Sequence, residues 1–519
     1  MEEDKKRLLW VDDEISLLRS HMIFLSERGY VVTPATNGDD AISLLRKEPF
    51  DVVLLDEMMA GRDGLSTLSE LRDIDANIPV IMITKSDEEE LMEEAIGQRV
   101  DDYLTKPVNP SQIISACKRI LDTRQIRVDR MGRDYVQEFN RIRTQLMGPM
   151  GWEDWIDIHV RLSEWDLEIE GFQDEALQQM HRDHRRECNI EFGQYIERVY
   201  PSWLRDEDPP PLSVDVISEF VYPYLTSGHQ VFFIVVDCLR LDQWLAIEPL
   251  MAEIFTIRRH HYYSILPTAT PYARNAIFSG LFPSELADRY PDIWRSGQDD
   301  EQSRNRYEHE LMDRQLEKMG LRFGHGSKYT KVLDTAEGRN VARKIRSLGS
   351  VSLVALVFNF LDILAHGRSE SEILQEIAPD EAAFRSLTVS WFTHSTLFDI
   401  LRKIARMGAV AVVTSDHGSI LGTRATVARG NRSTSTNLRY KYGSNLHCDP
   451  RQAVLIKNPL EYKLPRFSMS TNFILAKEDY YFVYPTRFHE YEEQYRGSFQ
   501  HGGISLEEMI LPVAVMKPK

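Results

Sequence analysis

The sequence is poor in cysteine: Cys117, Cys188, Cys238 and Cys448 are spread over 519 positions and form no CxxC pair. Thiols this sparse do not suggest a disulfide framework and fit a reduced, cytoplasmic protein. The sequence also has no uninterrupted apolar run of about 18 residues, which argues against membrane insertion through a transmembrane helix. Its first residues are mostly charged and lead straight into a strand-like segment, unlike a secretory signal peptide.

An excess of positive charge is missing as well. The chain has 62 lysines and arginines against 80 aspartates and glutamates, so its net charge of −18 gives no global attraction to nucleic acid or anionic membranes. An anionic substrate would have to be held by a metal ion or by a local basic cluster. The hydrophobic content of 42% is typical of globular proteins, and the length suits about three domains.

Residues 1–123 alternate strand-like and helix-like segments. The expected strands are residues 7–11, 51–55, 78–83 and 101–106, and the expected helices include 15–28, 39–46 and 86–97. This alternation predicts a parallel sheet with helices on both faces, in which ligands bind beyond the carboxyl ends of the strands.

Polar residues stand at those carboxyl ends. Asp12 and Asp13 follow the first strand, Asp56 the second and Thr84 the third, and Lys106 ends the fourth. Three acidic groups at one edge repel one another unless a hard cation joins them, and Mg2+ suits oxygen ligands while leaving room for a phosphate. Asp56 could then attack a phosphoryl donor, with Thr84 and Lys106 contacting the new phosphate oxygens.

This order of residues resembles the response-regulator receiver family across the first domain. The resemblance implies a flavodoxin-like fold, Mg2+ held by the acidic cluster, and phosphorylation of Asp56 by a sensor histidine kinase. It also assigns Tyr103 to the family's aromatic switch, which with Thr84 and Lys106 reads the phosphorylated state. Ala60 departs from the family, which often has proline there, and should alter a loop rather than the chemistry.

Residues 124–210 are helical and contain no recognisable DNA-reading module. The expected helices are residues 111–147, 152–170 and 174–199. Glycines separate them, as in a small helical bundle, and three consecutive prolines end the segment. Their mixed charges fit either a solvated surface or contacts to a partner subunit. With the receiver signature, this connector predicts that phosphorylation promotes a homodimer through the receiver face near Tyr103 and Lys106.

Residues 211–519 again place apolar strands before polar groups. The expected strands are residues 230–236, 353–358, 409–414, 453–456 and 509–515. They predict a third domain of α/β/α type with a mostly parallel sheet and functional groups at the strand ends.

Aspartates and histidines near these strand ends form two candidate metal sites. The first would comprise Asp237, Thr270, Asp416 and His417, and the second Asp362, His366 and His501. Imidazole and carboxylate ligands suit Zn2+. Two such ions about 3.5–4 Å apart can stabilise both the attacking and the leaving oxygens of a phosphoryl transfer. Each pattern alone is more often a capped turn or a helix pair, so the prediction depends on their combination.

Thr270 is the candidate nucleophile. It stands before Pro271 at the start of a predicted helix, where backbone N–H groups and the positive end of the helix dipole favour an alkoxide and a phosphate. A threonine hydroxyl is a poor nucleophile without a base or a metal. The alternative is an ordinary helix cap.

This order is similar to that of the alkaline phosphatase superfamily, and the segment 501–510, HGGISLEEMI, is similar to its PglZ-type branch. The resemblance favours Thr270 over Thr268, because Gly280 and Pro283 follow it at the spacing of the phosphodiesterases in this superfamily. Over its full length the chain resembles the PorX-type response regulators of Bacteroidetes. That resemblance implies a phosphodiesterase acting on cyclic or linear oligonucleotides, phosphorylation-linked dimerisation, and a role in controlling type IX secretion.

Four basic residues are candidate substrate contacts. Arg240 and Arg274 could bind the phosphate, and Arg439 and Lys441, in a basic loop at 424–441, could bind an oligonucleotide backbone. Surface salt bridges and a solvated insertion are the alternatives. The basic loop favours diesters over monoesters. A sulfatase is disfavoured, because Thr270 cannot become formylglycine and the histidines favour zinc over calcium.

Two further functions stay open. The third domain could be a signalling scaffold that binds a sigma factor or another protein, with a structural or vestigial metal site. A structural metal site would also show a complete set of metal ligands, so such a set does not distinguish this scaffold from an enzyme. A DNA-binding transcription factor is disfavoured by the acidic charge balance and by the lack of a helix-turn-helix after the first domain.

Overall fold

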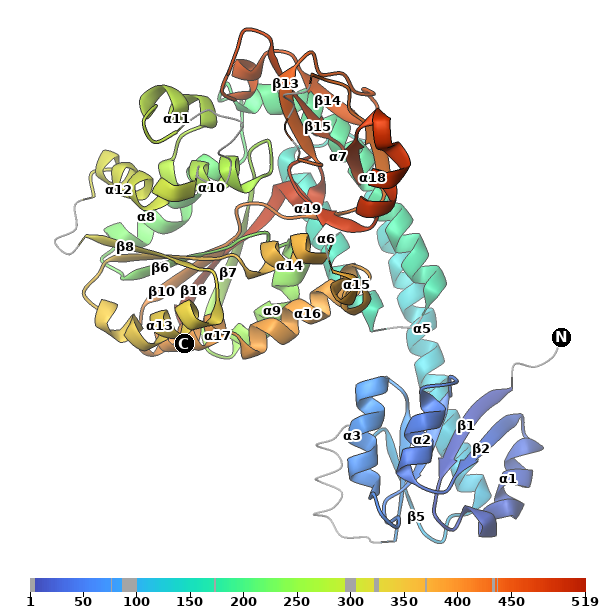
Figure 1. The fold of residues 1–519 in the computed structure, drawn as a ribbon. Coiled ribbons are helices and arrows are strands. Elements are labelled where there is room, and N and C mark those ends of the chain that lie inside the picture. The colour runs from blue at the N-terminus through green and yellow to red at the C-terminus, as the bar shows by residue number, and fades with distance from the viewer. Residues whose placement is uncertain are drawn as a thin grey trace. The chain divides into compact units, whose positions relative to one another are not determined.

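A computed structural model describes residues 5–75, 77–85, 100–171, 174–294, 305–321, 326–368, 371–431, 435 and 437–519 (Figure 1). The chain divides into two compact units, Met1–Arg141 and Ile142–Lys519, which are described separately below. The division falls inside the helix α5 (Pro110–Leu146), whereas the sequence analysis placed a domain boundary at residue 123.

The first unit is built on a five-stranded parallel sheet with the strand order β2-β1-β3-β4-β5. Its strands are β1 (Lys6–Val11), β2 (Tyr30–Ala35), β3 (Val52–Asp56), β4 (Val80–Thr84) and β5 (Asp102–Thr105). Its helices α2 (Gly38–Leu45) and α3 (Gly64–Ile74) pack on one face, and α1 (Arg19–Ser26) and the start of α5 pack on the other. The expected flavodoxin-like fold is confirmed. The expected helix at 86–97 lies outside the described residues.

The second unit begins with helices that the sequence predicted closely: the end of α5, then α6 (Trp152–Glu170) and α7 (Glu175–Trp203). Asp174 caps α7 by accepting a hydrogen bond from the backbone of Leu177. These helices do not form a bundle with a core of their own. Trp155 packs edge-on against Phe192, and Phe192 stacks on Tyr263 of the following domain. The connector therefore shares one hydrophobic core with the sheet behind it.

That sheet has six strands in the order β7-β18-β10-β6-β9-β8. They are β6 (Val231–Val236), β7 (Phe255–Tyr263), β8 (Ser327–Val332), β9 (Leu353–Phe358), β10 (Val410–Thr414) and β18 (Ile510–Pro518). Strands β10, β6 and β9 are parallel, as expected, and so is β8, which the sequence did not predict; β18 runs antiparallel to both β10 and β7. The segment at 453–456 is a strand, β14 (Ala453–Ile456), but it belongs to a separate sheet with the order β13-β15-β14.

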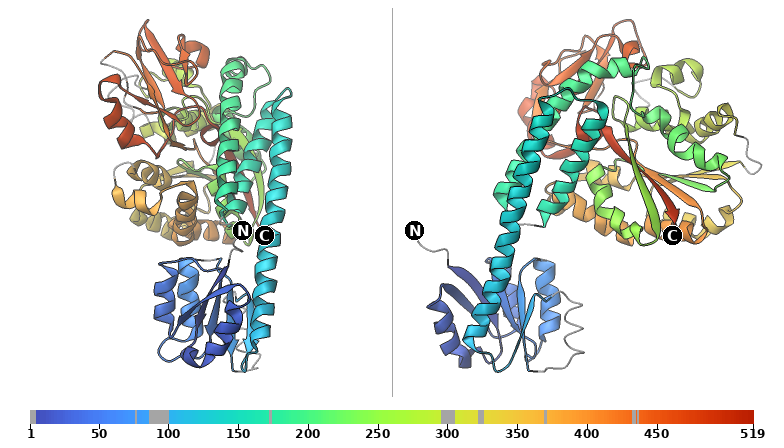
Figure 2. Two further views of the ribbon diagram at one scale, coloured as in Figure 1. Left: turned by 90° about the vertical axis from the view of Figure 1, so that its right-hand side faces the viewer. Right: turned by 180° about the vertical axis from the view of Figure 1, so that it is seen from behind.

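Helices cover both faces of the six-stranded sheet (Figure 2). One face packs against α9 (Leu241–Ala252), α13 (Thr335–Lys344), α16 (Glu381–His394) and α17 (Thr396–Arg406). The other packs against α7, α10 (Thr270–Ser279) and α12 (Glu308–Lys318). The remaining helices are α8 (Tyr222–Thr226), α11 (Pro283–Arg289), α14 (Phe360–Arg368), α15 (Glu372–Ile377), α18 (Phe488–Tyr495) and α19 (Leu506–Met509). The remaining strands are β11 (Ile420–Gly422), β12 (Arg424–Val427), β13 (Tyr440–Ser444), β15 (Thr471–Ala476), β16 (Tyr480–Val483) and β17 (Ser498–Gln500).

A buried histidine in α6 predicts that acid destabilises this unit. Among the described residues, neither ring nitrogen of His159 finds a hydrogen-bond partner, and burial, reinforced by the charge of Arg185, lowers its pKa to about 3. In the unfolded chain, His159 has its ordinary pKa of about 6.5. Its contribution to stability is therefore fully present above that pH and is lost as the pH drops from 6.5 towards 3. Between pH 6.5 and 4.5, we expect the free energy of unfolding of His159→Leu to fall by about 2–3 kcal/mol less than that of wild type.

Thermal unfolding monitored at both pH values measures this difference. His489→Leu is the matched control, because His489 is exposed on α18 and its replacement should leave the acid sensitivity of the wild type intact. An equal loss of stability for wild type and His159→Leu would contradict the prediction.

Candidate active site and phosphoacceptor site

The acidic residues of the first unit gather at the carboxyl edge of its sheet. Asp12 and Asp13 follow β1 and Asp56 ends β3, and one oxygen from each lies within 4.8 Å of the others. Lys106 Nζ donates to Asp56 Oδ2 at 2.8 Å and to Asp12 Oδ2 at 3.0 Å. Thr84 is buried at the end of β4, where its carbonyl accepts a hydrogen bond from the backbone of Lys106 at 2.7 Å.

The electrostatics of this cluster suit a phosphoacceptor. Burial raises the pKa of Asp56, and the charge of Asp12 adds to that effect, while Lys106 opposes it. Burial alone would lower the pKa of Lys106, but its two carboxylate partners outweigh burial and raise it. A divalent cation among these oxygens would relieve the repulsion between the carboxylates. Tyr103 on β5 is half-buried, and burial raises the pKa of its hydroxyl.

In the second unit, Asp237, Asp416 and His417 converge from the ends of β6 and β10 and are completely buried. Thr270, the first residue of α10, points at them. Its Oγ1 lies 2.9 Å from His417 Nε2 and 3.4 Å from Asp237 Oδ1. Gly280 ends this helix with a φ of 61°, a left-handed conformation that favours glycine.

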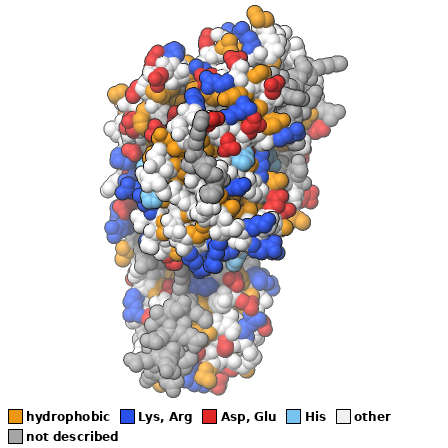
Figure 3. Space-filling view, turned by 90° about the vertical axis from the view of Figure 1, so that its left-hand side faces the viewer, with side chains coloured by type: hydrophobic (Ala, Val, Ile, Leu, Met, Phe, Trp, Pro, Cys, Tyr) orange, Lys and Arg blue, Asp and Glu red, His pale blue; other side chains and the backbone are white. Residues whose placement is uncertain are grey.

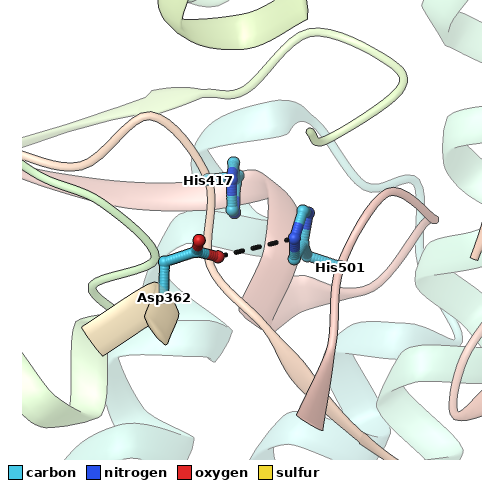
Figure 4. Close-up of side chains that lie close together, drawn as sticks. All are labelled: Asp362, His417 and His501. Atoms are coloured by element: carbon cyan, nitrogen blue, oxygen red, sulfur yellow. Dashed lines mark ion pairs between the residues drawn. The ribbon is translucent and has the colours of Figure 1, made fainter. Parts of the chain in front are cut away.

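A second group joins the first through His417. One ligand-type atom each from Asp362, His417 and His501 lies within 4.8 Å of the others. Figure 4 shows these three side chains close together. The rings of His417 and His501 stack with centroids 4.0 Å apart. His366 Nε2 lies 3.0 Å from His501 Nε2 and 3.3 Å from Asp362 Oδ1. All seven residues predicted to surround the metals thus meet in one place, with His417 common to both clusters.

Backbone carbonyls orient the two buried imidazoles. His417 Nδ1 lies 3.1 Å from the carbonyl of Gly418, and His501 Nδ1 lies 3.3 Å from the carbonyl of Thr268. If each Nδ1 donates its proton to that carbonyl, each Nε2 is left with a lone pair directed at the carboxylates. This is the arrangement that metal-binding histidines adopt in proteins.

The donor set fits divalent metal ions. Burial raises the pKa of Asp237 well above its usual range, and the neighbouring charge of Asp416 raises it further. Burial lowers the pKa of His501 well below its usual value, which keeps its ring neutral and able to bind a metal. Asp416 Oδ2 is buried without a hydrogen-bond partner among the described residues. Carboxylates and neutral imidazoles in this combination suit zinc.

Thr268 has a different environment from Thr270. Its hydroxyl donates to the carbonyl of Gly503 at 2.8 Å and accepts from the N–H of Gly502 at 3.1 Å. Both of its hydrogen-bonding functions therefore hold the loop of His501, and its oxygen is not directed at the metal-type cluster.

Arg274 lies at the site but does not face an open surface. It pairs with Asp237, and its Nε donates to Glu308 Oε1 at 2.7 Å. Glu308 is fully buried, and Asn305 donates to it and also to the carbonyl of Thr270, at 3.2 Å. Neither Glu308 nor Asn305 was identified from the sequence, because they follow no strand and match no motif; Arg274 was, although as a substrate contact.

The other three basic candidates are turned inward, which corrects the expectation that they contact substrate. Arg240 pairs with Asp242 and Glu381, and Arg439 pairs with Glu508. The Nζ of Lys441 donates to the carbonyls of Ser435 and Asn437, and burial lowers its pKa to about 7. Part of the basic loop, including residue 432, lies outside the described residues. On the face that Figure 3 shows, acidic and basic side chains are interspersed.

Comparison with known families agrees with this architecture. Residues 8–118 match the response regulator receiver domain, residues 125–204 the PorX response regulator linker domain, and residues 216–516 the BREX system PglZ alkaline phosphatase-like domain. The chain is a two-component response regulator with an alkaline phosphatase-like domain. It belongs to the PglZ family, and its three parts together are those of a PorX-type response regulator.

Two curated relatives each match about a quarter of this chain. The chain is 33% identical over 118 residues to the transcriptional regulatory protein ResD of Bacillus subtilis, covering 23% of this chain and 49% of that protein. It is 36% identical over 123 residues to the probable transcriptional regulator ycf27 of Porphyra purpurea, covering 23% and 49%. The chain thus spans about half the length of the curated relatives it matches. The solved receiver domain of the Francisella response regulator 1452 is 32% identical, covers 23% of this chain and 98% of that one, and gives a TM-score of 0.22.

None of the described helices combines the length and the hydropathy needed to cross a membrane.

Proposed function

We propose that phosphorylation of Asp56 controls a zinc-dependent phosphodiesterase in the PglZ domain, which acts on cyclic or linear oligonucleotides. The observation that carries this proposal is the position of Thr270, whose hydroxyl oxygen lies 2.9 Å from His417 Nε2 at the edge of a buried Asp/His cluster. The oligonucleotide substrate and the link to type IX secretion are supported by the resemblance to PorX-type regulators.

The residues at the site suit attack by Thr270. The hydroxyl oxygen of Thr270 lies 2.9 Å from His417 Nε2, and the first turn of α10 places the positive end of the helix dipole beside the reacting phosphate. Zinc ions bound here would lower the pKa of the hydroxyl and neutralise charge on the phosphoryl oxygens. The Thr270 hydroxyl would lose its proton to solvent and its oxygen would bond to phosphorus, while the ester bond breaks and the leaving oxygen takes up a proton from solvent. Water would then attack phosphorus and break its bond to the Thr270 oxygen, which takes up a proton and becomes a hydroxyl again as a phosphate monoester leaves.

The pairing of the nearby arginines favours a diester. A phosphate monoester carries one more negative charge than a diester, and that charge calls for a cation without another partner. Arg274 is paired with Asp237 and Glu308, and Arg240 with Asp242 and Glu381. Both guanidinium groups are thus already neutralised within the protein, and a singly charged diester suits the site better.

The first unit supplies the control. A sensor kinase would transfer a phosphoryl group to Asp56, with Mg2+ held by Asp12 and Asp13. Lys106, now paired with Asp56 and Asp12, would exchange one carboxylate for the new phosphate. We propose that this change promotes a homodimer and raises phosphodiesterase turnover.

The response to an acyl phosphate tests the controlled half of this function. With zinc present, acetyl phosphate and Mg2+ should raise the turnover of bis-p-nitrophenyl phosphate by about 5-fold or more, a typical coupling between two sites. Asp56→Asn should abolish the response, because the amide cannot form the phosphoanhydride. Light scattering with beryllofluoride should show the larger mass of a dimer.

Two outcomes would contradict the proposal in different ways. If turnover is equal with and without phosphorylation, the protein is an enzyme that phosphorylation of Asp56 does not control. A protein that binds zinc but cleaves no phosphoester would favour the scaffold, in which the PglZ domain binds a sigma factor or another protein partner.

A further inference from the structure

The short helix α19, labelled in Figure 1, contacts both loops that carry the buried histidines. Its Glu508 carbonyl accepts a hydrogen bond from the N–H of Gly418, directly after His417, at 3.2 Å. The Glu507 carbonyl is packed so closely against Gly418 that a Cβ atom there would lie 1.9 Å from it. Only glycine fits at position 418, so the backbone after His417 is packed tightly against α19.

The same helix holds the second loop through the side chain of Glu508. This carboxylate is fully buried and accepts a hydrogen bond from the N–H of Gly503, two residues after His501, at 2.8 Å. Arg439 pairs with it, and the hydroxyl of Ser505 donates to it at 2.7 Å. Any shift of α19 therefore displaces the backbone behind His501 as well as the backbone behind His417.

Helix α7 of the linker domain fixes the other side of α19. Asn189 accepts a hydrogen bond from the N–H of Leu506 at 2.8 Å and donates to Glu507 Oε2 at 3.1 Å. Arg185, one turn earlier, reaches Glu507 Oε1 at 3.4 Å and also pairs with Asp166 of α6. Arg185, Asn189 and Glu507 are all buried, so breaking one of their contacts leaves the partner without water to replace it.

From this arrangement we infer that α7 is a positioning element for the metal centre. Arg185 and Asn189 hold α19, and α19 holds the loops of His417 and His501 at the separation that metal binding requires. A displacement of α7 would then weaken metal binding, which gives the linker domain a direct means of regulating turnover. This inference rests on the proposed function, because it assumes that the Asp/His cluster binds zinc.

A charged side chain placed at the contact between α7 and α19 should weaken metal binding at a distance. Asn189→Asp sets a carboxylate against the buried carboxylate of Glu507, and the repulsion should push α19 away from α7. Changes to groups that orient metal ligands commonly lower metal affinity about 10–100-fold, and we expect about 10-fold or more here. The double variant Asn189→Asp, Glu507→Gln should restore affinity to within about 3-fold of wild type, because the new amide can donate to the new carboxylate.

Cobalt titration of the full-length protein provides the readout. Co2+ replaces Zn2+ in such sites, and its visible absorption reports the ligand geometry, so affinity and spectrum are read together without any turnover assay. Arg186→Ala is the matched control, since Arg186 is exposed on the same helix beside Arg185. It should bind Co2+ as wild type does. Circular dichroism and thermal unfolding confirm that each variant is folded.

The possible results separate this inference from the proposed function. Wild-type affinity and spectrum in Asn189→Asp would overturn the inference and leave the proposed function standing. So would a loss that the double variant does not restore, because it would reflect general damage rather than repulsion at this contact. If wild type binds no Co2+, or if Asp416→Ala binds as much Co2+ as wild type, the Asp/His cluster is not a metal centre, and both proposals fail.

Discussion

Thr270→Ala should lower the zinc-dependent turnover of bis-p-nitrophenyl phosphate by at least about 10³-fold, the order of loss seen when a nucleophile is removed. The hydroxyl of Thr270 is the group that lies against His417 and Asp237, at the first residue of α10. Removing it takes away the atom that would attack phosphorus. Initial rates at saturating zinc measure the effect, with p-nitrophenyl phosphate as the monoester for comparison.

Thr270→Ser separates the hydroxyl from the methyl group. It should keep measurable turnover, because an oxygen still stands at the same position. The variant Thr268→Val should instead act on stability, since the hydroxyl of Thr268 satisfies the backbone of Gly502 and Gly503. Equal turnover of wild type and Thr270→Ala would rule Thr270 out as the nucleophile.

Chelation of zinc is expected to abolish turnover and to lower the melting temperature of the larger unit. Without a metal ion, Asp237 and Asp416 are completely buried beside each other; Arg274 pairs with Asp237, but Asp416 Oδ2 has no hydrogen-bond partner among the described residues. A metal ion relieves this repulsion. Zinc at about a thousand times its dissociation constant would stabilise the folded state by about 4 kcal/mol, which differential scanning fluorimetry detects readily.

The variant Asp416→Asn tests the cause of that shift. It removes one of the two neighbouring carboxylates, so the zinc-free variant should melt no lower than the zinc-free wild type, while added zinc should raise its melting temperature little. If the chelator changes neither the melting temperature nor the turnover, the zinc site is refuted.

The central strands could be predicted from the sequence because their apolar runs are continuous. β3, β6, β9 and β10 are buried along their whole length, and each was identified within a residue or two. The bounds of α6 were predicted correctly, since a glycine precedes it and another follows it.

Three strands at the sheet edges could not be found in this way, although β5, which is also an edge strand, was predicted. β2, β7 and β8 lie at the ends of their sheets and are only partly buried along their length. β7 even carries two arginines and two histidines, which weaken its strand signal. The antiparallel direction of β18 was missed as well, because an apolar run has the same appearance in either direction.

At the site, strand ends and short motifs located the Asp, His and Thr side chains but not the residues that support them. Glu308 and Asn305 come from a helix start with no motif, and Glu507 gains its role only from contact with α7. The expected roles of Arg240 and Arg439 were wrong for a related reason. A basic residue in the sequence does not reveal whether its partner is a substrate phosphate or a buried carboxylate such as Glu508.

The position of β18 also constrains the order in which the domain can be completed. β18 is inserted between β7 and β10, and its whole length pairs with β7, a strand made far earlier on the ribosome. During synthesis, β7 therefore waits with an unsatisfied edge, which invites aggregation until β18 emerges. His501 and α19 appear just before β18, so six of the seven residues of the metal cluster are made by residue 417, and the last one, His501, follows only as the sheet closes.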